Sequence, residues 1–240
     1  MFWDLFKQAS TEGATVLGWE QNGRLHPSSL FVQWDALDYV KHYGGWFDVI
    51  HASPPCQGYS RTRRILEGKG LPNRRASNLV PATRAALQGH RYIIENVPGA
   101  PLRNPVTLCG SMFNLRTRAG HQLRRHRIFE CSFPVVAPGP CQHAGMTIGI
   151  FGNKARNTGA EKRHYSKPKH SRGEPPRDIL LTLADAREAM GSEWMSMAEL
   201  SQAIPPAYSK FFGSKIFSVD TVRPRVRDRE CPAPAAPEGQ

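Results

Sequence analysis

The chain has 240 residues, 40% of them hydrophobic and 9% aromatic, which suits one globular α/β domain with a substantial core and a small appendage. Lys and Arg number 32 against 20 Asp and Glu, so the formal net charge is +12. No apolar run approaches the roughly 20 residues that cross a bilayer, and no secretory signal pattern is present, so we expect no membrane association and a cytoplasmic location.

The positive charge is concentrated in one segment. Between positions 154 and 177 the basic residues are Lys154, Arg156, Lys162, Arg163, Lys167, Lys169, Arg172 and Arg177. Only Glu161 and Glu174 oppose them there. This excess favours a polyanionic partner, most simply nucleic acid, although a solvated basic surface would carry the same charge.

Five cysteines at irregular spacing argue against a disulfide framework. Cys131, Cys141 and His143 carry side chains that bind zinc, but no Cys-x-x-Cys pair accompanies them. The sequence therefore predicts no metal site.

The first part of the chain alternates short apolar runs with turn formers. Residues 14–20 predict a buried strand that ends in an acid, and residues 30–33 predict a second strand. A helix is expected to begin within 35–40, with Asp35 as its N-cap. Residues 47–52 form a compact strand candidate, which the following Ser-Pro-Pro would end.

Residues 78–88 fit a helix, and residues 91–97 fit another buried strand. Strand, helix and strand in this rhythm predict an α/β fold with a parallel, doubly wound sheet over residues 1–131.

The residue composition changes after residue 131. Residues 132–177 are rich in Gly, Pro, Lys and Arg, and they predict a small irregular basic lobe. Regular patterning returns over residues 178–223, with helices expected at about 183–190 and 206–217. Residues 224–240 predict a disordered tail.

A reactive cysteine is the first chemical candidate. Cys56 lies in the sequence Pro-Pro-Cys-Gln directly after the strand expected at 47–52, at the strand end where open sheets bind ligands. The two prolines restrict its backbone, and the nearby Arg61, Arg63 and Arg64 create an electropositive neighbourhood that favours the thiolate. A buried, inert cysteine is an equally good interpretation of this motif alone.

The second candidate is Glu95, in the sequence Glu-Asn-Val directly after an apolar strand. A partly desolvated carboxyl group there would favour the protonated form, which suits a general acid. A capping or ion-paired acid is a strong competing interpretation.

Arg125 and Arg127 form the third candidate. If residues 124–129 are a strand, both side chains point to one face and can converge on one anion or carbonyl. Alternatively, this is a charged edge strand that discourages aggregation.

The order of these three motifs resembles that of the cytosine-5 DNA methyltransferases. Further motifs of that family are resembled by the acid Glu20, by the Asp-Ala-Leu that begins at Asp35 and by residues 202–208 (Gln-Ala-Ile-Pro-Pro-Ala-Tyr), so matching pieces run from about residue 16 to 217. Asp4-Leu5-Phe6 also resembles the beginning of the family's first motif. The resemblance implies a Rossmann-like methyltransferase fold that binds S-adenosylmethionine (SAM), with a small target-recognition lobe. It also implies double-stranded DNA as partner and a monomer.

The resemblance further implies covalent catalysis. The Cys56 thiolate would attack C6 of cytosine while Glu95 donates a proton or hydrogen bond at N3, and C5 would then take the methyl group of SAM. Arg127, with Arg125, would bind the cytosine O2, and Asn96 would orient the Glu95 loop. The target base would be flipped out of the duplex.

Two further sets of residues follow from the resemblance. The residues expected to bind SAM are Asp4, Phe6, Glu20, Asp35, Pro54, Gln202 and Ala203. The residues expected to bind DNA are Gln57, Ser60, Arg61, Arg63, Lys154, Arg156, Lys162 and Arg163.

The sequence also departs from the family pattern. Residues 7–10 (Lys-Gln-Ala-Ser) replace the glycine-rich turn that lets the backbone approach SAM. A catalytically impaired or truncated relative that binds DNA without methylating it is therefore the alternative, and methylation of RNA or nucleotides also stays open. The small size resembles enzymes of phages or mobile elements, with a role in restriction-modification or in evading it.

Overall fold

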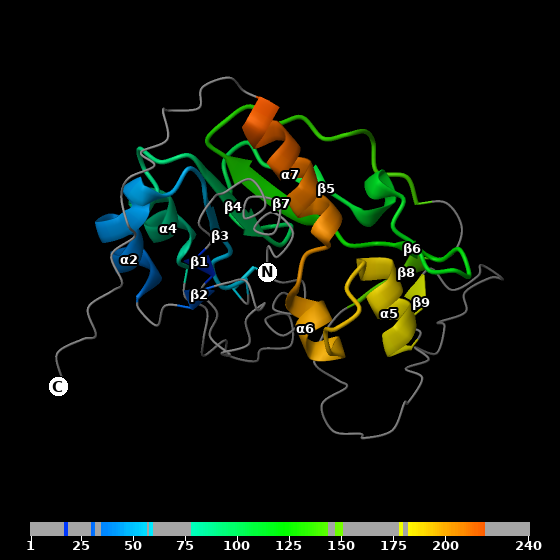
Figure 1. Cartoon of the computed structure of the whole chain (residues 1–240). Coiled ribbons are helices and arrows are strands. Elements are labelled where there is room, and N and C mark those ends of the chain that lie inside the picture. The colour runs from blue at the N-terminus through cyan, green and yellow to red at the C-terminus, as the bar shows by residue number, and fades with distance from the viewer. Residues whose placement is uncertain are drawn as a thin grey trace, which may run out of the picture.

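The computed structural model describes most of the central part of the chain and its last helices (Figure 1). The described residues are 35–56, 58–59, 78–143, 147–150 and 182–218, with the backbone of three strands at 17–18, 30–31 and 178–179. Within them the fold is mixed α/β with a mixed sheet. None of their helices has the length and apolar character needed to cross a membrane.

The central sheet has four strands in the order β3-β4-β7-β5. They are β3 (Ile50–Ala52), β4 (Tyr92–Asn96), β7 (Arg127–Cys131) and β5 (Val106–Leu108). β3 and β4 are parallel, as expected, but β7 is antiparallel to both β4 and β5. The prediction of an all-parallel sheet is therefore wrong for this part of the chain.

Two smaller sheets accompany it. β1 (Leu17–Gly18) pairs in parallel with β2 (Leu30–Phe31), within the two segments predicted to be strands. β6 (Gln122–Leu123), β8 (Thr147–Ile148) and β9 (Asp178–Ile179) form a parallel three-stranded sheet. β8 lies in the lobe that was predicted to be irregular. It was not predicted, because a two-residue strand leaves no periodic signal in the sequence.

The helices agree well with the sequence pattern. They are α2 (Ala36–Tyr43), η1 (Gly44–Trp46), α4 (Val80–Ala86), η2 (Gly110–Phe113), α5 (Leu183–Met190), α6 (Met197–Gln202) and α7 (Pro206–Ser218). Asp35 is the N-cap of α2, and its Oδ1 accepts hydrogen bonds from the amides of Leu37 and Asp38. α6 was not predicted, although Ser196 and Glu199 form the capping box that begins it.

The core of the central sheet lies beneath α7, which crosses β4, β7 and β5 in Figure 1. Tyr208, Phe212 and Ile216 of α7 pack against Ile93 and Phe129 of the sheet. All five side chains are at most 5% exposed. This contact fixes the position of the C-terminal helix on the sheet.

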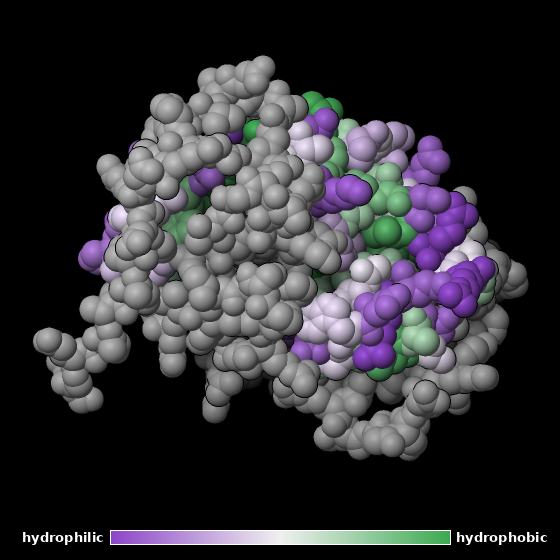
Figure 2. Space-filling model, viewed as in Figure 1, coloured by the Kyte–Doolittle hydropathy of each residue, from purple (hydrophilic) through white to green (hydrophobic). Residues whose placement is uncertain are grey.

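A second core joins α5 and α6 to β6 and β8, with Leu123, Ile148, Ala189 and Leu200 among its buried members. Figure 2 shows the same face of the molecule, where purple hydrophilic residues form the largest coloured area near these elements, with smaller green patches between them.

The strand directions bring one end of each of the four strands to the same edge of the central sheet. β3, β4 and β5 run in the same direction, because β7 is antiparallel to β4 and β5, so their carboxyl ends meet the amino end of β7 there. In chain order these ends lead to Cys56, Glu95, Cys109 and Arg127.

Candidate functional site

An ion pair joins the second and third motifs at this edge. Glu95 pairs with Phe129 across β4 and β7, so Glu95 and Arg127 project from the same face of the sheet. Nε of Arg127 lies 2.8 Å from Oε1 of Glu95, and their side chains are 12% and 11% exposed. The carboxyl group is therefore positioned by a charge-assisted hydrogen bond in a mostly buried setting.

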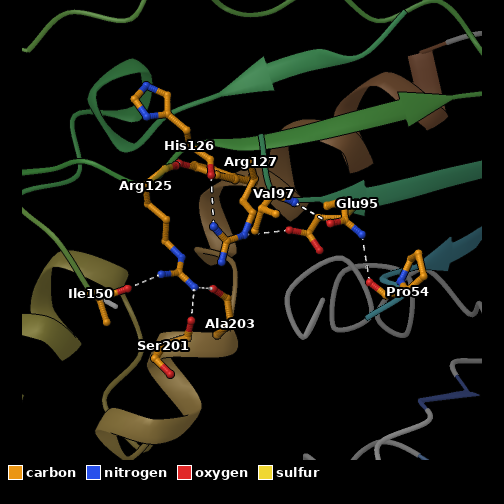
Figure 3. Close-up of polar contacts among 11 residues, drawn as sticks. Pro54, Glu95, Val97, Arg125, His126, Arg127, Ile150, Ser201 and Ala203 are labelled. Atoms are coloured by element: carbon orange, nitrogen blue, oxygen red, sulfur yellow. Dashed lines mark hydrogen bonds and ion pairs between the residues drawn. The ribbon is translucent and has the colours of Figure 1, made fainter. Parts of the chain in front are cut away.

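A hydrogen bond joins the Glu95 strand to the cysteine loop. Nδ2 of Asn96 donates to the carbonyl oxygen of Pro54 at 3.0 Å, and Oδ1 of Asn96 accepts from the amide of Val97 at 2.9 Å. Asn96 is 1% exposed. Figure 3 shows Pro54 and Glu95 near each other, and the dashed line that reaches Pro54 is the hydrogen bond from Asn96, the residue after Glu95. Asn96 therefore ties the end of β4 to Pro54, which is compatible with the orienting role expected for it.

Cys56 is half-buried beside these groups. Burial raises the pKa of its thiol, the Glu95 carboxylate raises it further, and Arg127 lowers it by less. The described surroundings therefore do not favour the thiolate, while Arg61, Arg63 and Arg64, on which the expectation was based, lie outside the described residues. Burial and a neighbouring acid, neither of which spacing reveals, outweigh the cation.

Arg125 does not converge with Arg127 on one group, contrary to the prediction. β7 begins only at Arg127, and Arg125 precedes it; in Figure 3 the Arg125 side chain reaches Ile150, Ser201 and Ala203, whereas Arg127 reaches Glu95. The Arg125 guanidinium is 1% exposed and donates to three backbone carbonyl groups. These belong to Ile150 at 2.8 Å, Ser201 at 2.8 Å and Ala203. Arg125 therefore links three segments of the fold.

The resulting network connects the C-terminal motif to the site. The Tyr208 hydroxyl donates to the backbone oxygen of Arg125 at 2.6 Å, and the backbone oxygen of Ala203 accepts from the Arg125 side chain. Ala203 is buried, whereas Gln202 is exposed at the end of α6. Burial and the Arg127 charge lower the pKa of Arg125 to about 9. Residues 201–208 are thus hydrogen-bonded to Arg125, which is two positions before Arg127.

The remaining predicted residues divide into two groups. Asp35 caps α2, and Pro54 lies beyond the carboxyl end of β3. The other predicted residues lie outside the described ones: Asp4, Phe6, Glu20, Gln57, Ser60, Arg61, Arg63, Lys154, Arg156, Lys162 and Arg163. Their roles stay predictions.

A second cluster of reactive side chains lies on the β5 side of Arg127. It contains Cys109, His126, Cys141 and His143. Sequence reasoning considered only the last two of these and missed the first two, because β5 and β7 bring them together from distant positions. A separate open pocket beside Cys131 and Phe133 lies at the other end of β7.

The described geometry places a half-buried thiol, a fixed carboxyl group and a cation at one sheet edge. These groups suit nucleophilic addition to an electrophilic ring carbon assisted by a proton donor. No protein-family model matches the sequence, and no curated protein matches it. The functional assignment therefore depends on the chemistry of the motifs and on the described contacts.

Proposed function

We propose that the chain is a SAM-dependent methyltransferase that acts on C5 of cytosine in DNA. The observation that carries the proposal is the link from Pro54 through Asn96 and Glu95 to Arg127. It joins the three motifs whose order resembles the cytosine-5 DNA methyltransferases. Cys56 would be the nucleophile, Glu95 the group that holds a proton at N3, and Arg127 the cation that positions Glu95 and binds O2.

The chemistry requires each of these groups. Cytosine C5 is weakly nucleophilic until a thiolate adds to C6 and a hydrogen-bond donor neutralises the charge that develops at N3. After methylation, loss of the C5 proton and cleavage of the bond between sulfur and C6 would release Cys56. Because the pKa of Cys56 is raised, its thiol would have to lose a proton before sulfur adds to C6. The neighbouring Glu95 carboxylate could take up this proton and then share it with N3, so that the proton lost from sulfur is the one that neutralises the ring.

Bound SAM would supply an electrophilic methyl group. Two described residues fit it by position. Asp35 offers a carboxylate after β2, and Pro54 lies beyond β3 at the sheet edge where open α/β sheets bind ligands. The carbonyl oxygens of Pro54 and Ala203 each already accept a hydrogen bond, from Asn96 and from Arg125, so neither oxygen is a strong argument for SAM binding. The finer assignment of a doubly wound, Rossmann-like fold belongs to this proposal.

DNA is the proposed substrate because of the +12 charge and the basic segment at residues 154–177. A target carbon inside a duplex must be flipped out of the stack before Cys56 can reach it. A short recognition sequence is expected, since few residues separate 132 from 177.

One sequence feature favours a second function. Residues 7–10 lack the glycines that the family uses to approach SAM, so the chain would bind DNA without methylating it if no other segment replaces that turn.

The decisive experiment measures transfer of a labelled methyl group from SAM to duplex DNA, with Cys56→Ala run beside the wild type. Transfer by the wild type alone, with the label recovered as 5-methylcytosine, is the expected result. If neither protein transfers label while both bind DNA with equal affinity, the binding-only function replaces the enzymatic one. Label recovered only in RNA or free nucleotides would reassign the substrate.

A further inference from the structure

Four side chains with metal-binding atoms converge beside the candidate active site. They are Cys109, His126, Cys141 and His143, and one ligand atom from each lies within 4.8 Å of the other three. The two sulfur atoms and two imidazole nitrogens come from three separate segments of the chain.

The sheet itself brings the first two residues together. β5 and β7 are antiparallel, with Leu108 opposite Arg127, so the next position outward places Cys109 opposite His126. Gly110 allows the close approach of η2 to β6, because a Cβ at this position would lie 2.8 Å from Cβ of Leu123. Cys109 is therefore fixed by regular structure, with 0% exposure.

The other two residues come from the segment that follows β7. Sγ of Cys141 lies 2.9 Å from Nε2 of His143 and 3.3 Å from Nε2 of His126. Nε2 of His143 also lies 3.2 Å from Sγ of Cys109. Both Cys141 and His143 are exposed, so an ion could enter from this side.

These distances suit a tetrahedral metal site. Zinc bonds of roughly 2.3 Å to sulfur and roughly 2.0 Å to nitrogen imply S···N separations of roughly 3.6 Å. The three observed S···N distances of 2.9, 3.2 and 3.3 Å are slightly shorter, so small outward movements of the side chains would seat an ion between them. Two thiolates with two imidazoles in this arrangement select zinc over Mg²⁺, Ca²⁺ or Mn²⁺.

We propose that Cys109, His126, Cys141 and His143 bind one zinc ion as a structural Cys2His2 site. Four protein ligands complete a tetrahedron, so the ion has no open position for catalysis.

The ion would have a mechanical role next to the catalytic candidates. Residues 141 and 143 would be joined to the amino end of β7, where Arg127 also donates from Nη1 to the backbone oxygen of His126 at 3.1 Å. Zinc would therefore fix the start of the basic lobe on the edge that carries Arg127. The inference does not depend on methyl transfer, since metal binding is measured directly.

The test begins with the full chain carrying an affinity tag without histidines, purified under reducing conditions without chelator. Elemental analysis is expected to give about one zinc per chain, with copper, iron and nickel far below that ratio. Exchange for cobalt(II) is expected to give the intense visible bands of a tetrahedral ion and a sulfur-to-cobalt charge-transfer band. Absence of stoichiometric zinc, both as purified and after incubation with excess zinc followed by desalting, overturns the proposal.

Variants separate this site from adventitious binding. Cys141→Ser and His143→Ala change exposed ligands, so the fold should survive, and each is expected to lower retained zinc at least tenfold. Cys131→Ser is the matched control, because it removes a cysteine of the same sheet that lies outside the cluster, and it should retain zinc. If the double variant Cys141→Ser with His143→Ala still binds one zinc with the same cobalt spectrum, the assignment of these ligands is wrong.

Discussion

Nε of Arg127 lies 2.8 Å from Oε1 of Glu95, across the antiparallel pair formed by β4 and β7. Because both side chains are almost buried, the two charges act on the neighbouring Cys56 with little screening. Their effects on its thiol are opposite: the Glu95 carboxylate raises the Cys56 pKa and Arg127 lowers it. The reactivity of one thiol therefore reports on both partners of the ion pair.

The first prediction concerns that reactivity. Glu95→Gln removes the charge that raises the Cys56 pKa, so alkylation of Cys56 by iodoacetamide at constant pH should become about three- to tenfold faster. Arg127→Gln should slow the reaction by a similar factor. Peptide-resolved mass spectrometry separates Cys56 from the other cysteines. An unchanged or slower rate for Glu95→Gln would contradict the assigned electrostatics.

The pH profile of the wild type follows from the same shift. Burial and then Glu95 raise the Cys56 pKa above its ordinary 9.0, so the alkylation rate should still be rising at pH 9 and level off only above it. In Glu95→Gln the profile should move to lower pH. A wild-type rate that reaches its plateau below pH 8 would show that groups outside the described residues dominate the thiol.

Arg125 and Arg127 should respond differently to the same substitution. Arg125→Met removes the buried donor to three backbone carbonyl groups, so the free energy of unfolding should fall by about 3 kcal/mol. Urea denaturation measures this loss, with Lys210→Met as an exposed control that should change stability by less than about 0.5 kcal/mol. If Arg125→Met abolished methyl transfer at full stability, Arg125 would contact substrate after all.

The sequence predicted elements whose signals are local. The N-cap Asp35 and the helices predicted at 183–190 and 206–217 are confirmed. They could be predicted because capping and the spacing of apolar residues depend only on residues close together in the sequence. The antiparallel placement of β7 was not predicted, since strand direction depends on long-range pairing. Short strands such as β6 and β8 carry too few residues for a periodic pattern.

The site was predicted by motif order rather than by geometry. Spacing identified Glu95 and Arg127, but their ion pair requires the pairing of β4 with β7. A strand over residues 124–129 would have placed Arg125 and Arg127 on one face, but β7 begins only at Arg127, and Arg125 binds backbone carbonyl groups instead. Cys109 and His126 had no local signal at all, since only the register of β5 on β7 makes them neighbours.

Glu130 should dominate the acid sensitivity of this sheet. Burial raises its pKa, but hydrogen bonds from Arg84, at 2.7 Å to each carboxylate oxygen, and from the amide of Arg103 lower it by more. Because the folded pKa is below the unfolded value, this stabilisation is present above the unfolded pKa and is lost as pH falls through the folded pKa.

The corresponding variant is Glu130→Gln. At pH 7 it should lower the free energy of unfolding by about 3 kcal/mol, because it leaves Arg84 without its buried partner. The difference between variant and wild type should shrink as pH falls below 4.5, the ordinary value for this carboxyl group. Denaturation at several pH values measures it. A difference that is independent of pH would exclude an ionised Glu130 as the cause.

The last prediction separates positioning from stability. Asn96→Asp replaces the amide that donates to Pro54 with an acceptor, so the loop that carries Cys56 should lose its tie to β4. Since misplacement by about 1 Å can cost about 100-fold in rate, methyl transfer should fall at least tenfold, mainly in kcat. Ser132→Ala is the matched control. It removes a comparable hydrogen bond, 2.8 Å from the amide of Tyr92 at the opposite end of β4, and should leave the rate within about twofold. Both variants should lower stability by about 1 kcal/mol, so equal losses of activity would show that Asn96 acts only through the fold.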